Sequence, residues 1–150
     1  MAEQEGSFSD ALPSIIAGAA EGLKEVAREI MDYSRVLCPK DTETLVNSAF
    51  TTEPEQYGDR MVIVIGYGRG EAINPKTGDH PSKYAVPVHE ILEAKHAPPT
   101  QAKFLEVPCL EYEPKMGETM RVWISRFTKG EGVATGSSSA GLIASSRRIV

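Results

Sequence analysis

The chain has 150 residues, with 41% hydrophobic and 25% charged side chains and a formal net charge of −5 at pH 7. This length suits one domain with one hydrophobic core. The acidic balance argues against a dedicated nucleic-acid binder, because neutralising phosphates needs a basic surface. No apolar run approaches the ~20 residues that a membrane span needs, and the polar residues 1–5 are unlike a signal peptide. We therefore expect a protein without membrane association that remains in the compartment where it is made.

Only two cysteines occur, Cys38 and Cys109, and they do not form a CxxC motif. Two free thiols in a reducing compartment are the simplest interpretation. We expect no cofactor and no metal.

The first element that the sequence predicts is a long amphipathic helix. Residues 1–9 are small and polar and predict a loose N-terminal arm, and the helix is expected to begin near Asp10. Its apolar residues recur at three-and-four spacing up to Met31, and Cys38-Pro39 ends it, since the residue before proline disfavours helical backbone. Gly18 and Gly22 weaken the helix slightly, but their four-residue spacing permits another backbone to approach closely.

A pair of strands is expected next. Residues 49–53 and residues 61–67 have strand composition, and residues 54–59 between them have turn chemistry. The second strand is apolar on both faces, which predicts a central position with one face against the first helix. Residues 68–83 then predict an exposed, mobile loop, and loops of this length inside a domain are usually functional.

The last third of the chain predicts a short edge strand or turn and a broken helix. Pro87 limits residues 84–90 to an edge strand or turn. A helical region spans roughly residues 102–127, and we expect Pro108 and Pro114 to split or kink it into a short helix near 105–112 and a better one after Pro114. Residues 129–150 are rich in glycine and serine and predict an extended C-terminal arm. The domain is therefore expected to span residues 10–128.

Catalytic motifs are weak throughout. His89-Glu90 begins like HExxH, but Glu93 stands where the second histidine belongs and the next histidine is His96. The glycines at 66, 68 and 70 follow a strand, but neither a GK[ST] sequence nor a helix follows them. We therefore predict that the chain is not an enzyme; the alternative is a small cytosolic metal-dependent enzyme using His89, Glu90 and His96.

Three segments in a fixed order resemble the tail-component or minor-capsid family of small head–tail neck (tail-completion) proteins of siphophage type. The first segment is similar to the family pattern Pro-x-Asp-Thr-Gly-x-Leu-x-x-Ser. Its matching residues are Pro39, Asp41, Thr42, Leu45 and Ser48. Glu43 stands where the family has glycine, so the turn there is expected to differ. Asp41 and Thr42 are suited to capping a short helical turn that Leu45 anchors in the core.

The second segment resembles the family's Tyr-Ala-x-x-Val-Glu edge segment through Tyr84, Ala85 and Val88, with His89-Glu90 at the acidic position. The third resembles its Pro-x-x-Phe-Leu approach to the final helix. Phe104, Leu105 and Leu110 match that pattern, while Pro108 and Cys109 depart from it. The resemblance covers roughly residues 12–127.

The resemblance implies an α+β fold in which a long N-terminal helix and a C-terminal helix pack on a small twisted antiparallel sheet, with extended termini. It implies a structural virion protein of a tailed bacteriophage that is assembled in the host cytoplasm. As a homo-oligomer, expected to be a hexameric ring in the neck, it would join the portal, adaptor or head-completion protein to the tail terminator or tube protein. Genomic DNA would pass through the lumen without sequence-specific binding. A minor capsid or decoration protein is the alternative within the same class.

These expectations place the functional residues at interfaces. Loop 68–83 is expected to contact the next ring, residues 84–90 to form the seam between subunits, and residues 129–150 to lie on a neighbour. The candidate interface residues are Arg69, Glu71, Lys76, Asp79, Tyr84, Val88, His89, Glu90, Arg147 and Arg148.

Overall fold

A computed structural model describes residues 8–94 and 96–130, and these residues form an α+β fold. The helices are α1 (Phe8–Leu37), α2 (Thr44–Asn47), α3 (Pro81–Glu90) and α4 (Glu106–Thr128). The strands are β1 (Phe50–Thr51), β2 (Glu55–Tyr57), β3 (Arg60–Val62) and β4 (Ile65–Gly66). The predicted fold class is therefore confirmed. Residues 1–7 and 131–150, which include most of the two predicted arms together with Arg147 and Arg148, lie outside the described residues.

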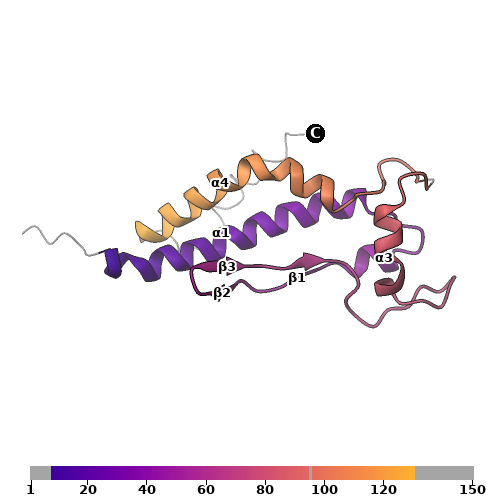
Figure 1. Cartoon of the computed structure of the whole chain (residues 1–150), viewed down its shortest axis with the longest axis horizontal. Helices are drawn as coiled ribbons and strands as arrows, with labels where there is room; N and C mark the ends of the chain where they lie inside the picture. Colours follow the sequence, from indigo (N-terminus) through magenta and orange to yellow (C-terminus); the bar gives the residue numbers. More distant parts are fainter. Residues whose placement is uncertain (1–7, 95, 131–150) are drawn as a thin grey trace, which may run out of the picture.

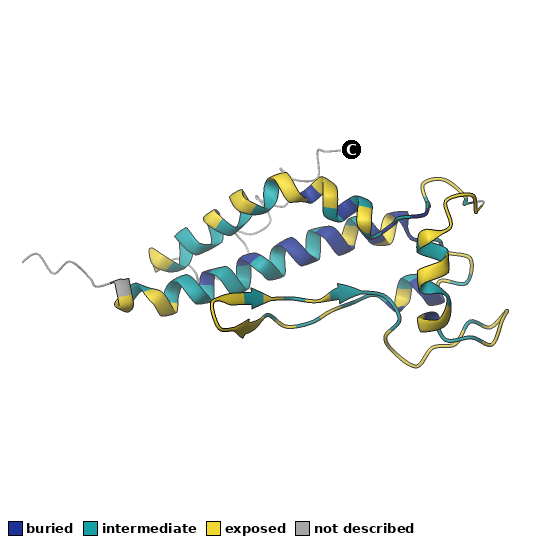
Figure 2. Ribbon diagram, viewed as in Figure 1, coloured by how far each residue is buried: buried dark blue, intermediate teal, exposed yellow. Residues whose placement is uncertain are grey.

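Helix α1 is the middle layer of the molecule. Figure 1 shows α4 running antiparallel along one side of α1 and the strands along the other, with α2 and α3 gathered at the end where α1 finishes. The distribution of buried residues agrees with this arrangement. They lie mainly along the middle and end of α1 and at the start of α4 (Figure 2). Val26, Ala27, Ile30 and Met31 are at most 5% exposed. The predicted apolar stripe is therefore the core-forming face.

The two glycines of α1 lie where α4 comes closest. A Cβ atom on Gly18 would lie 2.7 Å from the Cα of Ile124 and 3.0 Å from the carbonyl oxygen of Trp123. A Cβ on Gly22 would lie 3.0 Å from the sulfur of Met120 and 3.2 Å from the Cβ of Trp123. Contacts this short leave no room for a methyl group, which confirms the close backbone approach predicted from the glycine spacing.

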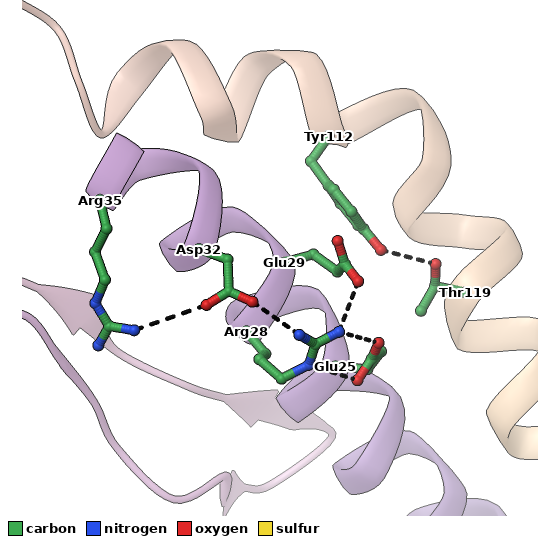
Figure 3. Close-up of polar contacts among 7 residues, drawn as sticks. All are labelled: Glu25, Arg28, Glu29, Asp32, Arg35, Tyr112 and Thr119. Atoms are coloured by element: carbon green, nitrogen blue, oxygen red, sulfur yellow. Dashed lines mark hydrogen bonds and ion pairs between the residues drawn. The ribbon is translucent and has the colours of Figure 1, made fainter. Parts of the chain in front are cut away.

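A cluster of charged side chains runs along the more open side of α1 (Figure 3). The guanidinium of Arg28 donates to Glu25, Glu29 and Asp32 at 2.6–2.8 Å. Hydrogen bonding to Glu25 raises the pKa of Arg28, so the cation persists at every ordinary pH. One arginine thus bridges three carboxylates of α1, two of which, those of Glu25 and Glu29, are largely covered.

The strands form a long, interrupted hairpin in place of the two continuous strands expected. β1 pairs with β4 and β2 pairs with β3, both antiparallel, in separate two-stranded sheets. β2 lies inside the segment predicted as a turn, because the chain reverses only at Gly58-Asp59. The predicted central position of residues 61–67 is wrong: Ile63 and Ile65 face α1, but Val62 and Val64 are 40% and 48% exposed. No third strand or helix among the described residues covers that second face.

Residues 84–90 form a helix, so the predicted edge strand or turn is wrong. The half-buried residues Tyr84, Ala85, Val88 and His89 are spaced to share one helical face, and this spacing outweighs the proline signal. Pro81 occupies the first turn, where its missing N–H costs no hydrogen bond. The predicted loop therefore ends at His80 and not at residue 83.

Helix α4 runs unbroken through both of its prolines, which corrects the predicted split. Pro108 is the third residue of the helix, a position whose N–H has no partner inside a helix. Pro114 is exposed, so the carbonyl of Leu110 that loses its partner remains accessible to water. The contacts of α4 along α1 hold the helix together across this point.

The close approach at Gly18 generates a stability prediction. We expect Gly18→Ala to lower the free energy of unfolding by about 1–3 kcal/mol, because the added methyl group would overlap the α4 backbone. Gly117→Ala is the matched control: Gly117 is exposed on α4, and a methyl group there would meet nothing within 4 Å, so alanine should stabilise the helix by about 0.5–1 kcal/mol. Urea denaturation followed by circular dichroism measures both. Equal effects of the two changes would contradict the close approach.

Candidate functional site

The interface residues predicted within the described part of the chain gather at one end of the molecule. α3 carries Tyr84, Val88, His89 and Glu90, and the loop at residues 67–80 carries the others. Figure 1 shows both segments beside α2, at the end of the layered helices and strands. We call this region, residues 39–48, 67–94 and 96–105, the end region.

The inner face of α3 packs on a small core. Phe104 is 1% exposed and forms a buried cluster with Leu37, Cys38 and Leu45. Tyr84 and Val88 are half-buried against this cluster. These two predicted interface residues therefore attach α3 to the domain, and the opposite face of the helix is the one that meets solvent.

His89 joins the end of α3 to the start of α4. Its Nε2 accepts from the backbone N–H of Glu106 at 3.3 Å, and its Nδ1 donates to a carboxylate oxygen of Glu90 at 2.6 Å. The ring also lies edge-on against Phe104, with 5.0 Å between centroids. Lys103 binds Glu90 as well, and Lys103 and His89 together lower the pKa of the Glu90 carboxyl. His89 therefore acts as a helix cap.

His80 performs the same task at the other end of α3. Its Nδ1 accepts from the backbone N–H of Ser82 at 3.2 Å, while Nε2 donates to the carbonyl oxygen of Gly70 at 2.7 Å. The ring thus caps α3 and fastens the loop to it. Sequence analysis missed this residue, although a histidine directly before Pro81-Ser82 stands at a position typical of a helix cap.

The loop residues are partly engaged with the domain. The guanidinium of Arg69 lies 4.0 Å from the centroid of the Phe50 ring. Lys76 binds Asp41 at 2.6 Å. Asp79 binds Lys83 at 3.3 Å. Glu71 is exposed. The predicted mobile loop is therefore tied to its surroundings at several points, with its charged groups on the outside.

Residues of the first family-like segment hold the end region together. Leu45 is 5% exposed in the core cluster, which confirms its predicted anchoring role. The hydroxyl of Ser48, which is 3% exposed, donates to the carbonyl of Leu45 at 2.6 Å and accepts from the N–H of Gly68 at 3.0 Å. The capping role predicted for Asp41 and Thr42 is wrong, because Glu43 precedes α2 without any side-chain cap.

Glu43 has left-handed backbone geometry, with φ of 59°. This conformation is costly for residues with a Cβ and open to glycine. The position is the one at which the family pattern has glycine. The structure thus requires here the backbone conformation that the pattern's glycine would adopt most easily.

A pocket of about 300 Å³ lies between this segment, the loop and α3. Asp41, Thr42, Asp79 and Tyr84 are among the residues that line it. The hydroxyl of Tyr84 is buried and has no hydrogen-bond partner among the described residues. The pocket presents carboxylates and hydroxyls, but no nucleophile paired with a base.

Cys38 lies behind the end region, where it is fully buried near Tyr67. Burial raises the pKa of the Cys38 thiol to about 12, and it also raises the pKa of Tyr67, whose hydroxyl lies 2.8 Å from that of Ser34. A thiol with this pKa is protonated and unreactive at neutral pH. Cys38 and Cys109 are both free, and Cys38 is a packing residue.

Three large apolar residues are exposed on α3 or directly after it, among polar neighbours such as Lys83 and Glu90. Val86 is 69% exposed, and Ile91 and Leu92, directly after the helix, are 52% and 72% exposed. Val86 also borders an open groove of about 210 Å³ beside Phe104 and Leu105. Exposed apolar groups in one contiguous segment mark an interaction surface more often than a catalytic one.

Neither a metal centre nor a membrane span is found among the described residues. No group of three or more histidine, cysteine or acidic side chains lies close enough there to hold a metal ion, so His89, Glu90 and His96 do not assemble the ligand set of the enzyme alternative. None of the described helices combines the length and apolar character needed to cross a bilayer. No family model, curated protein or solved structure matches the chain.

The geometry at Glu43 generates a second stability prediction. We expect Glu43→Gly to raise the free energy of unfolding by about 1 kcal/mol, because glycine relieves the left-handed backbone. Glu113→Gly is the control: this residue is exposed inside α4, where glycine should cost about 1 kcal/mol. Urea denaturation measures both variants. A destabilised Glu43→Gly protein would show that the side chain, and not the backbone, matters at this position.

Proposed function

We propose that the protein is a structural component of a tailed-bacteriophage virion. In this role it forms a homo-hexameric ring in the neck and joins the portal or adaptor side of the head to the tail terminator or tube. The genome passes through the lumen of the ring, and the acidic chain does not grip it. The ring performs no catalysis.

The observation that carries the proposal is the agreement between the family-like segments and the residues that hold the end region together. Leu45, Ser48 and Phe104 match the family patterns and are only 5%, 3% and 1% exposed, whereas Leu110, which also matches, is 58% exposed. Glu43 adopts the backbone geometry of the pattern's glycine. The α+β fold also agrees with the fold that the resemblance implies.

Within this proposal α3 forms the seam between subunits. Val86, Ile91 and Leu92 supply apolar contact area, and Glu90 supplies a charge at the rim. Tyr84 and Val88 support the helix from inside, and His89 fixes its end. The loop with Arg69, Glu71, Lys76 and Asp79 then faces the next ring. A heterologous contact of this kind closes into a ring when its rotation permits.

A minor capsid or decoration protein is the second candidate. It would use the same apolar surface of α3 against a capsid lattice. Copy number separates the two roles.

The proposal is tested by quantitative mass spectrometry of purified virions, with this chain counted against the portal subunit. We expect about half as many copies as the portal, because a six-fold ring would adjoin the twelve-fold portal of such phages. Hundreds of copies would instead assign the chain to the capsid surface. Absence from the particle would overturn the virion role.

The seam is tested by Leu92→Ser. We expect this variant to dissociate into smaller species at concentrations at which the unchanged protein is a ring, because the change removes an exposed apolar contact. Leu110→Ser is the matched control, since Leu110 is 58% exposed on α4, outside the proposed seam. Native mass spectrometry gives the assembly state, and the circular dichroism spectrum should be unchanged in both if the subunits remain folded. A Leu92→Ser ring as stable as the unchanged one would remove α3 from the seam.

A further inference from the structure

A second apolar feature lies away from the end region, between α1 and the hairpin. It is an open groove of about 300 Å³, and every residue that lines it is apolar. Its lining comes from three elements: α1 supplies residues such as Val26 and Ile30, the hairpin supplies Met61 to Ile63 and Ile65, and α4 supplies Met116. We call it the hairpin groove.

The hairpin beside this groove is incompletely covered. Val62 belongs to the lining and is 40% exposed, while Val64, outside the lining, is 48% exposed on the strand face opposite Ile63 and Ile65. A strand with branched apolar residues on both faces is typical of a strand buried on both sides. The groove therefore has the composition of an interior surface, although no described segment fills it.

The chain itself contains a segment suited to the groove. The described residues end at Gly130, two residues beyond α4, and the sequence continues to residue 150. In this continuation, residues 131–150 are mostly small or polar, with Leu142-Ile143 followed closely by Arg147-Arg148. The adjacent pair of large apolar side chains matches an apolar groove of this size.

The length of the continuation also suffices. The stretch from Thr128 back to Met116 covers ~18 Å of helix at 1.5 Å per residue. The twelve residues from Glu131 to Leu142 reach up to ~40 Å when extended. The segment is therefore more than long enough to return along α4 to the level of the groove, and the excess length leaves it free to reach a neighbouring copy held close by in the proposed ring.

Charge points to the same pairing. The hairpin carries three exposed acids, Glu53, Glu55 and Asp59, against one base, Arg60. Glu53 pairs with Lys24 of α1 at 3.0 Å, and Glu55 accepts from the hydroxyl of Tyr57, so the hairpin keeps an acidic balance around these contacts. Glu55 lies directly opposite Val62, a lining residue of the groove. A segment seated through Leu142-Ile143 brings Arg147 and Arg148 to this acidic hairpin.

We propose that residues 142–148 of one subunit occupy the hairpin groove of the next subunit in the ring. This inference rests on the proposed ring and identifies what each subunit contributes to its neighbour. Leu142 and Ile143 bind in the groove, and Arg147 and Arg148 pair with the acids of the hairpin. Each subunit is then clasped to the next at a second contact, separate from the α3 seam.

Disulfide trapping in the full-length chain tests this contact. One sample carries Val62→Cys at the groove and a second carries Ile143→Cys in the segment, both with Cys109→Ser, while the buried Cys38 thiol stays unreactive. The two are mixed, allowed to exchange subunits, and oxidised with oxidised glutathione, which takes up the two electrons released when the thiols join. We expect a covalent dimer of one chain of each kind on a non-reducing gel.

The matched control replaces Val62→Cys by Val36→Cys. Val36 is 47% exposed at the end of α1, outside the lining of the groove, and should give several-fold less dimer. A dimer yield no higher than that of the control overturns the inference. A single chain carrying both cysteines should give a ladder of multimers; an internal disulfide alone would place the segment in its own groove and overturn docking between subunits.

Native mass spectrometry of the same samples separates this inference from the function on which it rests. An intact hexamer without the cross-link contradicts the groove contact and leaves the ring in place. A monomer without the cross-link contradicts both the contact and the ring. A cross-linked ring from a chain that is absent from virions keeps the contact and overturns the neck role.

Discussion

The contact between α1 and α4 is the constraint on which the other parts of the structure depend. Gly18 and Gly22 bring the two helices together until backbone and Cβ atoms touch, and this fixes where α4 lies along α1. Since α1 is the middle layer, the hairpin packs on the side of α1 opposite α4, and α2 and α3 lie at the end of α1. With α4 held in this way, Phe104 just before it becomes the core of the end region.

The end region is stabilised by short-range devices more than by a large core. α3 has only ten residues and contains Pro87, so it would be unstable alone. His80 caps its start, and His89 links its end to the first turn of α4. Both rings serve as acceptors through one nitrogen while donating through the other, which requires the neutral imidazole. Their identity therefore has a structural explanation that needs no metal and no catalysis.

The long elements were predictable from the sequence, and the end region was predictable only in part. The spacing of apolar residues located α1 to within two residues, and the glycine pair indicated its close contact. The three prolines led to wrong predictions, each for a different reason. The packed face of α3 outweighs the cost of Pro87, and Pro108 lies in the first turn of α4, where its missing N–H costs no hydrogen bond. Pro114 is exposed, so water can bind the carbonyl that loses its partner. The apolar strand at 61–67 predicted a sheet covered on both faces. A sequence pattern indicates that a face is suited to burial, but not whether the element that covers it belongs to the same chain. Residues 84–90, which were predicted to form the subunit seam, belong to the surface helix α3, but Tyr84 and Val88 lie on its inner face.

The interruption of the hairpin affects whether copies of this chain can associate through their strand edges. At Thr52 the side-chain hydroxyl, in place of the backbone carbonyl, accepts from the N–H of Val64, and the strand ladder stops there. Each of the four strands is only two or three residues long, and Pro54 lies between β1 and β2. Such short edges offer few free backbone groups in a row to another strand. The apolar hairpin is therefore a poor template for the strand-by-strand growth of open-ended fibrils.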